Sequence, residues 1–342
     1  MKSMWKNMWN RVRVPLFVMM LSITVMVGVI LSVPFLFALH IQREPSSQAF
    51  EQFPVTVDPE NKTVVENVQV NAFLDSTHFS RQAAVGNAGD MFWKVFAIIA
   101  TTITDAPWYQ SIAAADGRFV TITAGMRKEQ VASTFAKELQ WTTKQQREFT
   151  TAVAPAPLPL IEGSFSPGTY LVTIGMTPSE AQALVNERFT EDILSHYGPE
   201  TEKIVPLEEA LIIASLIQRE TIGTSDMRLV SGVIWNRIFI DMKLQIDATL
   251  QYAKANVTTA GSWWPKVVPA DIYRRSAHNT YLNAGLPPTP IANPSVAAVL
   301  AALNPLKTSC LFYFNDKAGN ILCTDTYAEH VALLKKHYGR GK

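Results

Sequence analysis

The pattern of hydrophobic and polar residues begins with one long apolar run. Residues 14–39, VPLFVMMLSITVMVGVILSVPFLFAL, contain no charged side chain. An α-helix rises about 1.5 Å per residue, so this run is long enough to cross a hydrocarbon core roughly 30 Å thick. The sequence therefore predicts a transmembrane anchor over residues 14–40.

The residues on either side of this run predict its orientation. The first 13 residues carry only basic charges, from Lys2, Lys6, Arg11 and Arg13. Basic flanks remain in the cytoplasm, so we expect residues 1–13 to form a cytoplasmic tail, residues 41–53 a linker, and the remainder to face outward. A cleaved secretory signal is the alternative, although its apolar region would be shorter. It also leaves most of the chain outside the cytoplasm.

Two similar patterns follow, one on each side of a predicted boundary. Residues 117–139, GRFVTITAGMRKEQVASTFAKEL, predict a strand, a turn at Gly125 and an amphipathic helix. Residues 168–189, GTYLVTIGMTPSEAQALVNERF, repeat this order, and their turn GMTPSEA echoes GMRKEQV. The proline-rich stretch APAPLPL at residues 154–160 predicts a boundary between them.

The alternating stretch VENVQVNAFL, residues 65–74, predicts a further strand upstream. We therefore expect an α+β region over residues 54–159, within which residues 54–117 have no clear assignment. A second α+β domain is expected over residues 160–342.

The stretch ASLIQRETIG, residues 214–223, points a carboxylate into the apolar side of a predicted helix. Glu220 follows Ile217, Leu216 and Ile213 by three, four and seven residues, which is the spacing of one helix face. Gly223 predicts a left-handed helix stop, which places Glu220 in the last turn.

This carboxylate has two interpretations. It could pair with a buried Arg or Lys or escape at a frayed helix end, since strongly buried carboxylates are rare unless paired. It could instead be a proton donor, because burial and the negative end of a helix dipole both raise the pKa of a carboxyl. A Glu that stays protonated near neutral pH is what general acid catalysis requires.

Other polar residues follow in the same domain. Thr224, Ser225 and Asp226 predict the cap of a helix over residues 227–240. In LQIDATLQYA, residues 244–253, Gln245 and Asp247 would share one face of an extended segment, although Asp247 could equally cap the next helix. 

The loop HNTYLNAGLPPTPIANP, residues 278–294, is stiffened by prolines. Asn279 and Tyr281 could hydrogen-bond to a sugar and stack on it, while Tyr281 could equally pack beneath the loop.

The composition and the motifs that are missing argue against several classes of ligand. The chain has 342 residues and a net charge of +1, from 30 basic and 29 acidic side chains, which does not suggest binding to nucleic acid. HExxH motifs, clustered histidines, phosphate-binding glycine loops and GxSxG elbows do not occur, so we expect no metal or organic cofactor.

The two cysteines, Cys310 and Cys323, bracket a predicted hairpin, LFYFNDKAGNIL. A disulfide is possible in an oxidising compartment. If Phe314 pairs with Ile321, however, the cysteines lie diagonally, which argues against a bridge.

Four segments together resemble one protein family, the YceG-like endolytic murein (lytic) transglycosylases, or MltG family. The resemblance covers about residues 118–337 and is strongest from Leu207 onward. Near Gly125 the chain resembles the family's LysM-like module, and IEGSFSPGTY resembles its junction. The four segments are ALIIASLIQRETIG, NRIFIDMKLQIDATLQYA, HNTYLNAGLPPTPIANP and NPLKTSCLFYF. The resemblance implies an N-terminal transmembrane helix, a small LysM-like module within residues 54–159, and a YceG-like catalytic domain over residues 160–342.

The resemblance also implies a site and a reaction. Glu220 matches the family's catalytic Glu, which precedes Thr in an E-x-E-T signature. It would act first as acid and then as base, cleaving the MurNAc–GlcNAc β-1,4 bond to leave 1,6-anhydro-MurNAc ends. The residues that would orient the sugars are Gln245, Asp247, Asn279 and Tyr281. The chain departs from the family pattern at Gln218, Ile246, Ala248, Ser164, Ser166 and Gly168.

The implied partners are the glycan strands of peptidoglycan, with cell-wall synthases as candidate protein partners during strand termination. The chain would then reside in the cytoplasmic membrane. Two alternatives stay open. A hydrolytic muramidase would use Asp247 as a second carboxylate. A non-catalytic wall-binding or septal scaffold would not cleave the glycan at all.

Overall fold

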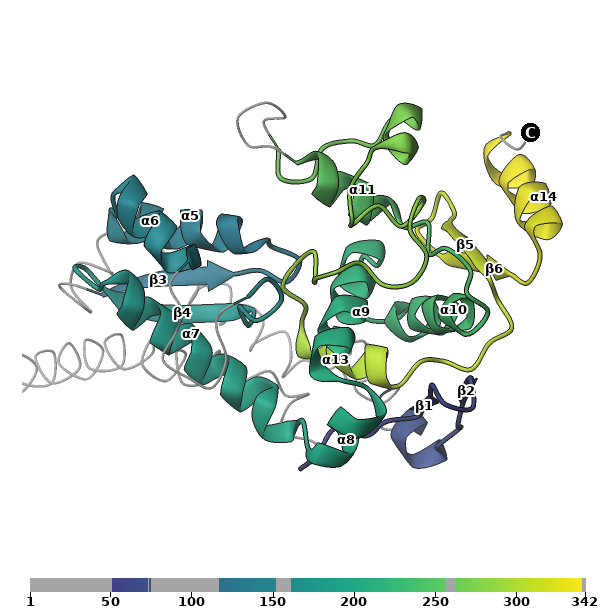
Figure 1. Ribbon diagram of the computed structural model, residues 1–342, viewed down its shortest axis with the longest axis horizontal. Helices are drawn as coiled ribbons and strands as arrows, with labels where there is room; N and C mark the ends of the chain where they lie inside the picture. Colours follow the sequence, from purple (N-terminus) through teal and green to yellow (C-terminus); the bar gives the residue numbers. More distant parts are fainter. Residues whose placement is uncertain (1–50, 73, 75–116, 152–160, 256–261, 340–342) are drawn as a thin grey trace, which may run out of the picture.

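The computed structural model describes residues 51–72, 74, 117–151, 161–255 and 262–339, which form a mixed fold of helices and strands (Figure 1). The predicted cytoplasmic tail, the anchor, nearly all of the linker and the proline-rich boundary lie outside these residues. Within them, no helix has both the length and the apolar character needed to cross a membrane.

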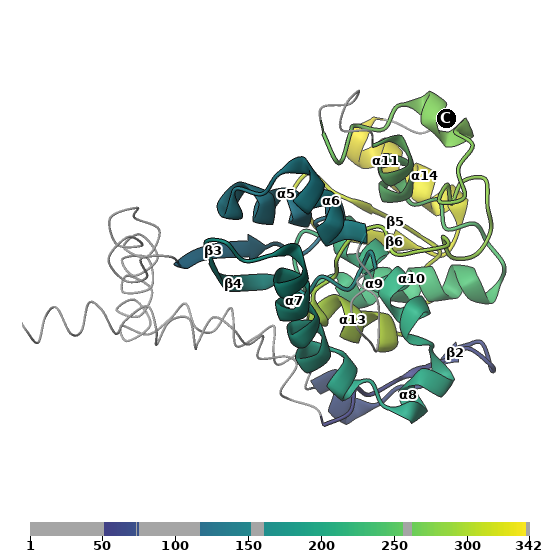
Figure 2. The same ribbon diagram turned by 60° about the vertical axis from the view of Figure 1, so that its left-hand side comes forward.

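The first part of the fold is a two-stranded antiparallel sheet whose buried face packs against helices. Strands β3 (Gly117–Ile122) and β4 (Gly168–Thr173) pair from Gly117 opposite Thr173 to Ile122 opposite Gly168. Figures 1 and 2 show α5 and α6 beside β3 and α7 beside β4, and side chains of all three helices share one core with those of the strands. Their bounds are Lys128–Leu139 for α5, Thr143–Thr151 for α6 and Pro178–Asp192 for α7.

The two predicted strand–turn–helix patterns are confirmed, and they are built alike. Gly125 and Gly175 take φ values of 85° and 92° in the two turns, a backbone region that glycine enters without a steric cost. Each turn leads into a helix. The backbone N–H of the helix's N-cap residue donates to the side chain three residues later. The Gln130 side chain accepts the Arg127 N–H at 3.0 Å, and the Glu180 side chain accepts the Thr177 N–H at 2.7 Å.

A separate hydrophobic core holds this part together. Its centre is aromatic, with the Phe135 and Phe149 rings 5.0 Å apart and both side chains fully buried. The other members are Val120, Ile122, Val131, Ala132, Leu139, Phe165, Tyr170, Val172, Ala181 and Val185. We call this part, residues 117–192, the small module.

The second part is mainly helical and is built around α9 (Leu207–Glu220). Residues 210–217 are all buried, because α13 and α10 pack against this helix and enclose most of its circumference. The surrounding elements are α8 (Pro199–Ile204), α10 (Met227–Phe239), α11 (Asp247–Lys254), α13 (Val296–Leu303), β5 (Phe312–Asn315), β6 (Ile321–Thr324) and α14 (Tyr327–Tyr338), with short 3-10 turns at Leu194–His196 and Pro269–Tyr273. We call this part the helical core.

The segment upstream of the small module packs on the helical core instead. It contains the short strands β1 (Val57–Asp58) and β2 (Thr63–Val64), and Phe53 and Val57 belong to the core of α9. The strand predicted over residues 65–74 is wrong, because residues 68–72 are helical. 

The Asn67 side chain explains this helix, since it accepts the N–H groups of Gln69 and Val70 at 3.0 and 3.1 Å. Burial then follows a helical spacing. Val70 and Leu74 enter the core, while Val68 is 80% exposed.

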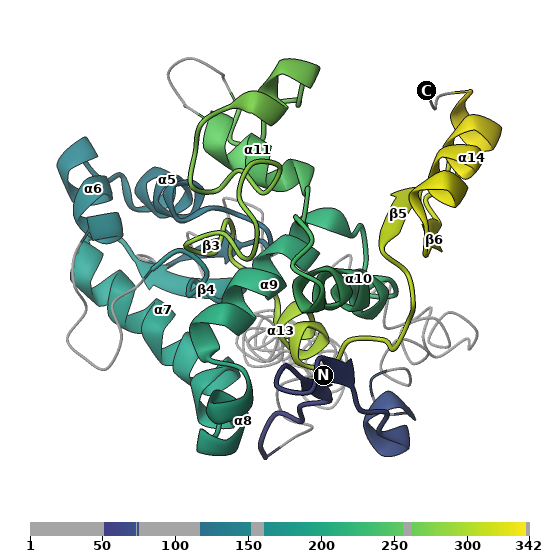
Figure 3. The ribbon, with the colours of Figure 1, turned by 45° about the vertical axis from the view of Figure 1, so that its right-hand side comes forward.

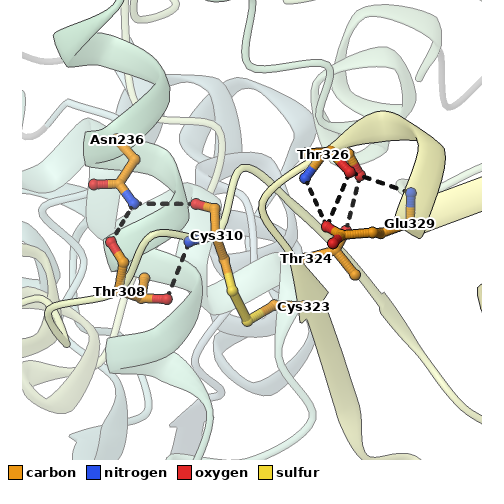
Figure 4. Close-up of a disulfide and its surroundings, with 7 residues drawn as sticks. All are labelled: Asn236, Thr308, Cys310, Cys323, Thr324, Thr326 and Glu329. Atoms are coloured by element: carbon orange, nitrogen blue, oxygen red, sulfur yellow. Dashed lines mark hydrogen bonds between the residues drawn. A yellow bond between two sulfur atoms is a disulfide. The ribbon is translucent and has the colours of Figure 1, made fainter.

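The hairpin near the C-terminus forms as predicted, but its register differs by one residue. Phe314 pairs with Leu322 and not with Ile321. Figure 3 shows this hairpin and α14 standing to one side of the helices. The expectation against a disulfide is wrong, since Cys310 and Cys323 are bonded (Figure 4). The ladder begins only at Phe312, so its pairing geometry does not constrain Cys310.

Candidate active site

Glu220 is the last residue of α9, which agrees with its predicted place in the last turn of that helix. The helix ends because Thr221 turns to an extended conformation, with φ −113° and ψ 144°, while its N–H still bonds to the Ile217 carbonyl. The predicted left-handed stop at Gly223 is wrong, because Gly223 does not have a positive φ. The carboxyl thus sits where the backbone of α9 stops and the chain changes direction.

Two groups from distant segments hold the Glu220 carboxyl. The Tyr313 hydroxyl of β5 donates to Oε2 at 2.9 Å, and the backbone N–H of Ala248, in the first turn of α11, donates to the same carboxyl group. Among the described residues, no ion pair includes Glu220. The neighbouring Arg219 instead lies over the Trp264 ring, 3.8 Å from its centroid. The interpretation of Glu220 as half of a buried ion pair therefore has no support.

The surroundings of Glu220 raise its pKa. Burial is the largest cause, and the negative charge of Asp247 adds to it. The hydrogen bonds from Tyr313 and Ala248 and the charge of Arg219 act in the opposite direction, but they do not outweigh burial. The carboxyl therefore retains its proton to a higher pH than an ordinary glutamate, which suits a general acid.

Gln218, which departs from the family pattern, has a structural contact. Its Oε1 accepts the Ser295 N–H at 3.1 Å and the Ser295 hydroxyl at 2.8 Å. Ser295 is the N-cap residue of α13. The Gln218 side chain therefore fastens the last turn of α9 to the start of α13.

Gln245 and Asp247 lie at the start of α11, on one exposed face. Both are exposed, while Ile246 between them is buried, which agrees with the predicted alternation. Gln245 adopts a left-handed φ of 51°, and its N–H bonds to the Thr280 carbonyl at 3.2 Å. Asp247 is the first residue of α11 rather than its N-cap, which is Ile246.

The loop after residue 276 brings an aromatic hydroxyl to this face. The Tyr281 hydroxyl donates to Asp247 Oδ1 at 2.6 Å, and the Tyr281 ring is half-buried. Burial and the bond to Asp247 raise the pKa of Tyr281. Asp247 and Tyr281 thus lie close enough to Glu220 for their charges to interact.

Asn279 has a different position from the one predicted. It is fully buried, and its Nδ2 donates to the carbonyls of Ile272 and Arg274 at 3.1 and 2.8 Å. Its Oδ1 accepts the Tyr281 N–H at 2.9 Å. Asn279 therefore braces the loop from inside and fixes the backbone of Tyr281, and it is not part of the exposed face.

Neither Tyr313 nor Arg237 was predicted from the sequence as part of the site. The Arg237 guanidinium of α10 donates to the Leu311 carbonyl at 2.6 Å and to the Leu244 carbonyl at 2.6 Å. It therefore ties together the segments that carry Tyr313 and Asp247. Arg237 could have been noticed as a charged residue within the apolar helix MRLVSGVIWNRIF. Nothing in the sequence around Tyr313 indicates that it belongs to the site.

The small module is joined to the helical core by the Asn293 side chain. Its Oδ1 accepts the N–H groups of Gly163 and Phe165 at 2.9 and 3.0 Å, and its Nδ2 donates to the Met126 carbonyl at 2.8 Å. Beside it, the buried Glu162 carboxyl accepts the Lys128 N–H at 2.8 Å, at the start of α5. Burial is the main cause that raises the pKa of Glu162 to about 8.

Metal chemistry has no candidate ligands within the part of the chain that the structure describes. No group of three or more His, Cys, Asp or Glu residues there could hold a metal ion.

Known proteins resemble this chain in sequence and in fold. The endolytic murein transglycosylase of Bacillus subtilis (strain 168) is 30% identical over 239 residues, which cover 64% of this chain and 64% of that protein. The protein of the same name from Streptococcus pneumoniae serotype 2 (strain D39 / NCTC 7466) is 28% identical over 185 residues, which cover 52% of this chain and 32% of that protein. The chain thus matches less than two thirds of the length of either relative.

A solved crystal structure also resembles this fold. It is a YceG-like protein from Listeria monocytogenes, which matches with a TM-score of 0.53 and 26% identity over 66% of this chain and 80% of that one. The model of the YceG-like family matches residues 94–336, well over half of the sequence. These residues include Glu220 and every polar group that surrounds it, and on this match the chain belongs to the YceG-like family.

Proposed function

We propose that this chain is a lytic transglycosylase that cleaves the MurNAc–GlcNAc β-1,4 bond within peptidoglycan strands. The product would carry a 1,6-anhydro-MurNAc end. The observation that carries the proposal is the environment of Glu220: one half-buried carboxyl with a raised pKa, held by Tyr313 and Ala248 and without an ion pair to any residue that the structure describes. The related proteins named endolytic murein transglycosylase support the same chemistry.

The first half of the reaction uses Glu220 as an acid. Its carboxyl proton passes to the oxygen that links the two sugars, the bond from C1 of MurNAc to that oxygen breaks, and GlcNAc leaves as an alcohol. Positive charge develops at C1. The conjugate carboxylate of Glu220 is then stabilised by the Tyr313 hydroxyl and the Ala248 N–H, which both donate to it.

The second half uses the same residue as a base. The Glu220 carboxylate takes the proton from the C6 hydroxyl of MurNAc, and the C6 oxygen bonds to C1 and closes the anhydro ring. Glu220 ends the cycle protonated, and no water is consumed. A glycosidase that uses water normally needs two carboxyls about 5 Å or roughly 6.5–9.5 Å apart, whereas an internal nucleophile removes that need.

The exposed residues around Glu220 would orient the sugars. Gln245 and Asp247 lie on the exposed face at the start of α11, and Tyr281 completes it through its bond to Asp247. We assign Asn279 an indirect role, since its Oδ1 bonds to the Tyr281 backbone. No metal or organic cofactor takes part in the proposed cycle.

We also propose where the chain acts. The uncharged run over residues 14–39 and the basic residues before it would make it a single-pass protein of the cytoplasmic membrane, with residues 160–342 outside. There it would terminate glycan strands beside the cell-wall synthases, guided by the LysM-like module. A reporter fused after Lys342 should be active outside the cytoplasm, and cytoplasmic activity would contradict the orientation.

The reaction is tested by Glu220→Gln in the full chain, with Glu208→Gln as the matched control. Glu208 is exposed in the first turn of the same helix. Glu220→Gln keeps the side-chain size and removes the transferable proton, so cleavage should fall by about a hundred- to ten-thousand-fold. The melting temperature should hardly change, because Glu220 has no ion partner among the described residues that the substitution would leave uncompensated.

Mass spectrometry of the peptidoglycan products separates the alternatives. Anhydro-muropeptides from the unaltered chain and from Glu208→Gln, but not from Glu220→Gln, are the expected result. Reducing ends in place of anhydro ends would identify a hydrolytic muramidase. Binding to peptidoglycan without any cleavage would identify a scaffold. Normal anhydro-muropeptide release by a stably folded Glu220→Gln protein would remove Glu220 from the mechanism.

A further inference from the structure

We propose that the Cys310–Cys323 disulfide is a positioning element of the active site, which holds the Tyr313 hydroxyl on Glu220 by fixing the β5–β6 hairpin to α10. Reducing this disulfide should therefore lower turnover while the protein is still folded. The inference rests on the function proposed above, which it extends by a redox-sensitive contact.

One side of the disulfide is firmly attached to the helical core. The Asn236 Nδ2 of α10 donates to the carbonyls of Thr308 and Cys310 at 2.7 and 3.0 Å (Figure 4). Arg237, one residue on, holds the Leu311 carbonyl at 2.6 Å. Cys310 itself is buried, with 7% of its surface exposed. The chain therefore reaches β5 along a path that α10 fixes.

The other side of the disulfide lies on the return strand. Strands β5 and β6 have four residues each, and the turn between them is stabilised by bonds to the Asp316 side chain. A two-stranded hairpin of this size is only marginally stable by itself. The bond from Cys323 to Cys310 therefore joins β6 to the segment that α10 holds.

Tyr313 lies directly on the path between this bond and Glu220. It pairs with Cys323 across the hairpin, and residues that face each other in an antiparallel pair carry their side chains on the same side of the sheet. Its hydroxyl then bridges to Glu220, 93 residues earlier in the chain. Hydrogen bonds weaken steeply as distance and angle depart from their optimum, so a small shift of β5 would weaken this contact.

Opening the bond is a simple exchange reaction. An external dithiol breaks the sulfur–sulfur bond, supplies two electrons and two protons, and becomes a disulfide itself, while Cys310 and Cys323 become thiols. Nothing else in the site needs to change. The remaining groups that face Glu220 are Asp247, Tyr281, Arg219 and the Ala248 N–H, with Arg237 behind Tyr313.

The test compares the full chain with a Cys310→Ser, Cys323→Ser double variant, each with Tyr313 and with Tyr313→Phe. Turnover of peptidoglycan should fall on the order of tenfold when either the disulfide or the hydroxyl is lost, the size of one hydrogen bond to a charged group. KM should change less than kcat. Removing the disulfide in the Tyr313→Phe background should cause little further loss, because both changes act through the same contact.

The pH profile distinguishes positioning from general destabilisation. The Tyr313 bond lowers the pKa of Glu220, so weakening it should move the alkaline fall in activity to higher pH. Thr177→Ala is the control, since it removes the N-cap of α7 in the small module. It should lower the melting temperature without moving the pH profile.

Several results would overturn the proposal. They are unchanged kcat without the disulfide, a loss that simply multiplies with that of Tyr313→Phe, or a pH profile that does not move. If the double variant does not fold, the unaltered chain treated with a phosphine reductant and checked by circular dichroism replaces it. If the chain cleaves nothing, the proposed function fails. Titration of the Glu220 carboxyl by carbon-13 NMR in the oxidised and reduced protein still decides this inference.

Discussion

Glu162→Gln should stabilise the protein at neutral pH, although it removes a carboxyl that bonds to the start of α5. The side chain is 5% exposed, and its Oε2 has no hydrogen-bond partner among the residues that the structure describes, while Oε1 accepts the Lys128 N–H at 2.8 Å. Burial, aided by the charge of Glu129, raises the pKa from its ordinary value of 4.5 to about 8. A glutamine keeps the acceptor, cannot ionise and places an amide where Oε2 lies.

The size of the stability gain follows from the difference between the pKa of Glu162 in the unfolded chain and in the folded protein. The unfolded chain loses it near pH 4.5 and the folded protein near pH 8, so the stability that the neutral carboxyl supplies at low pH is lost progressively between these values. Each pH unit in this interval costs about 1.4 kcal/mol, which amounts to about 3 kcal/mol at pH 7. For a protein of this size, that corresponds to a melting temperature on the order of 5–10 °C higher for Glu162→Gln.

The assay is thermal unfolding followed by circular dichroism at intervals from pH 5 to pH 8. The unaltered chain should lose stability relative to Glu162→Gln throughout this range, and the two should differ least at pH 5. Glu187→Gln, an exposed change on α7, should run parallel to the unaltered chain. A constant difference between the Glu162→Gln and unaltered curves across the range would refute the reasoning, because it would show that Glu162 is not held protonated.

Two further predictions concern the helical core. Gly232→Ala should destabilise the protein by roughly 1–3 kcal/mol despite the better helix propensity of alanine, because its Cβ would lie 2.3 Å from the Leu306 carbonyl oxygen; a higher melting temperature would contradict this. Asp247→Asn retains an acceptor for Tyr281 but removes a charge that raises the pKa of Glu220, so the alkaline fall in activity should move to lower pH with anhydro products retained. If Asp247 instead activates water, the same change should lower cleavage by about a hundredfold or more.

The features that the sequence predicted correctly depend on local periodicity. Glu220 could be placed on the apolar face of its helix because the spacing to Ile217 and Ile213 is a property of one helix. The two strand–turn–helix units could be found because Gly125 and Gly175 occupy turns that favour glycine. Such signals lie within a few residues of the structure that they specify.

The features that the sequence did not predict depend on distant contacts. Tyr313 reaches Glu220 only because the hairpin pairs in one particular register, and the predicted register differed from it by one residue. Asn279 has a side chain suited to sugars, but the loop uses all of its hydrogen-bonding groups internally. A chemically suitable residue type therefore does not show whether its polar atoms face the solvent.

The contact between Gln218 and Ser295 has a consequence for motion. Helix ends ordinarily fray, and a carboxyl on the final residue would then sample many rotamers and exchange its proton with bulk water. Here the last turn of α9 is tied on one side to the start of α13 and on the other to Tyr313. The terminal turn should therefore be as rigid as the middle of the helix, with slowly exchanging amide hydrogens. That rigidity would let one carboxyl release a proton and recover another at nearly the same point in space.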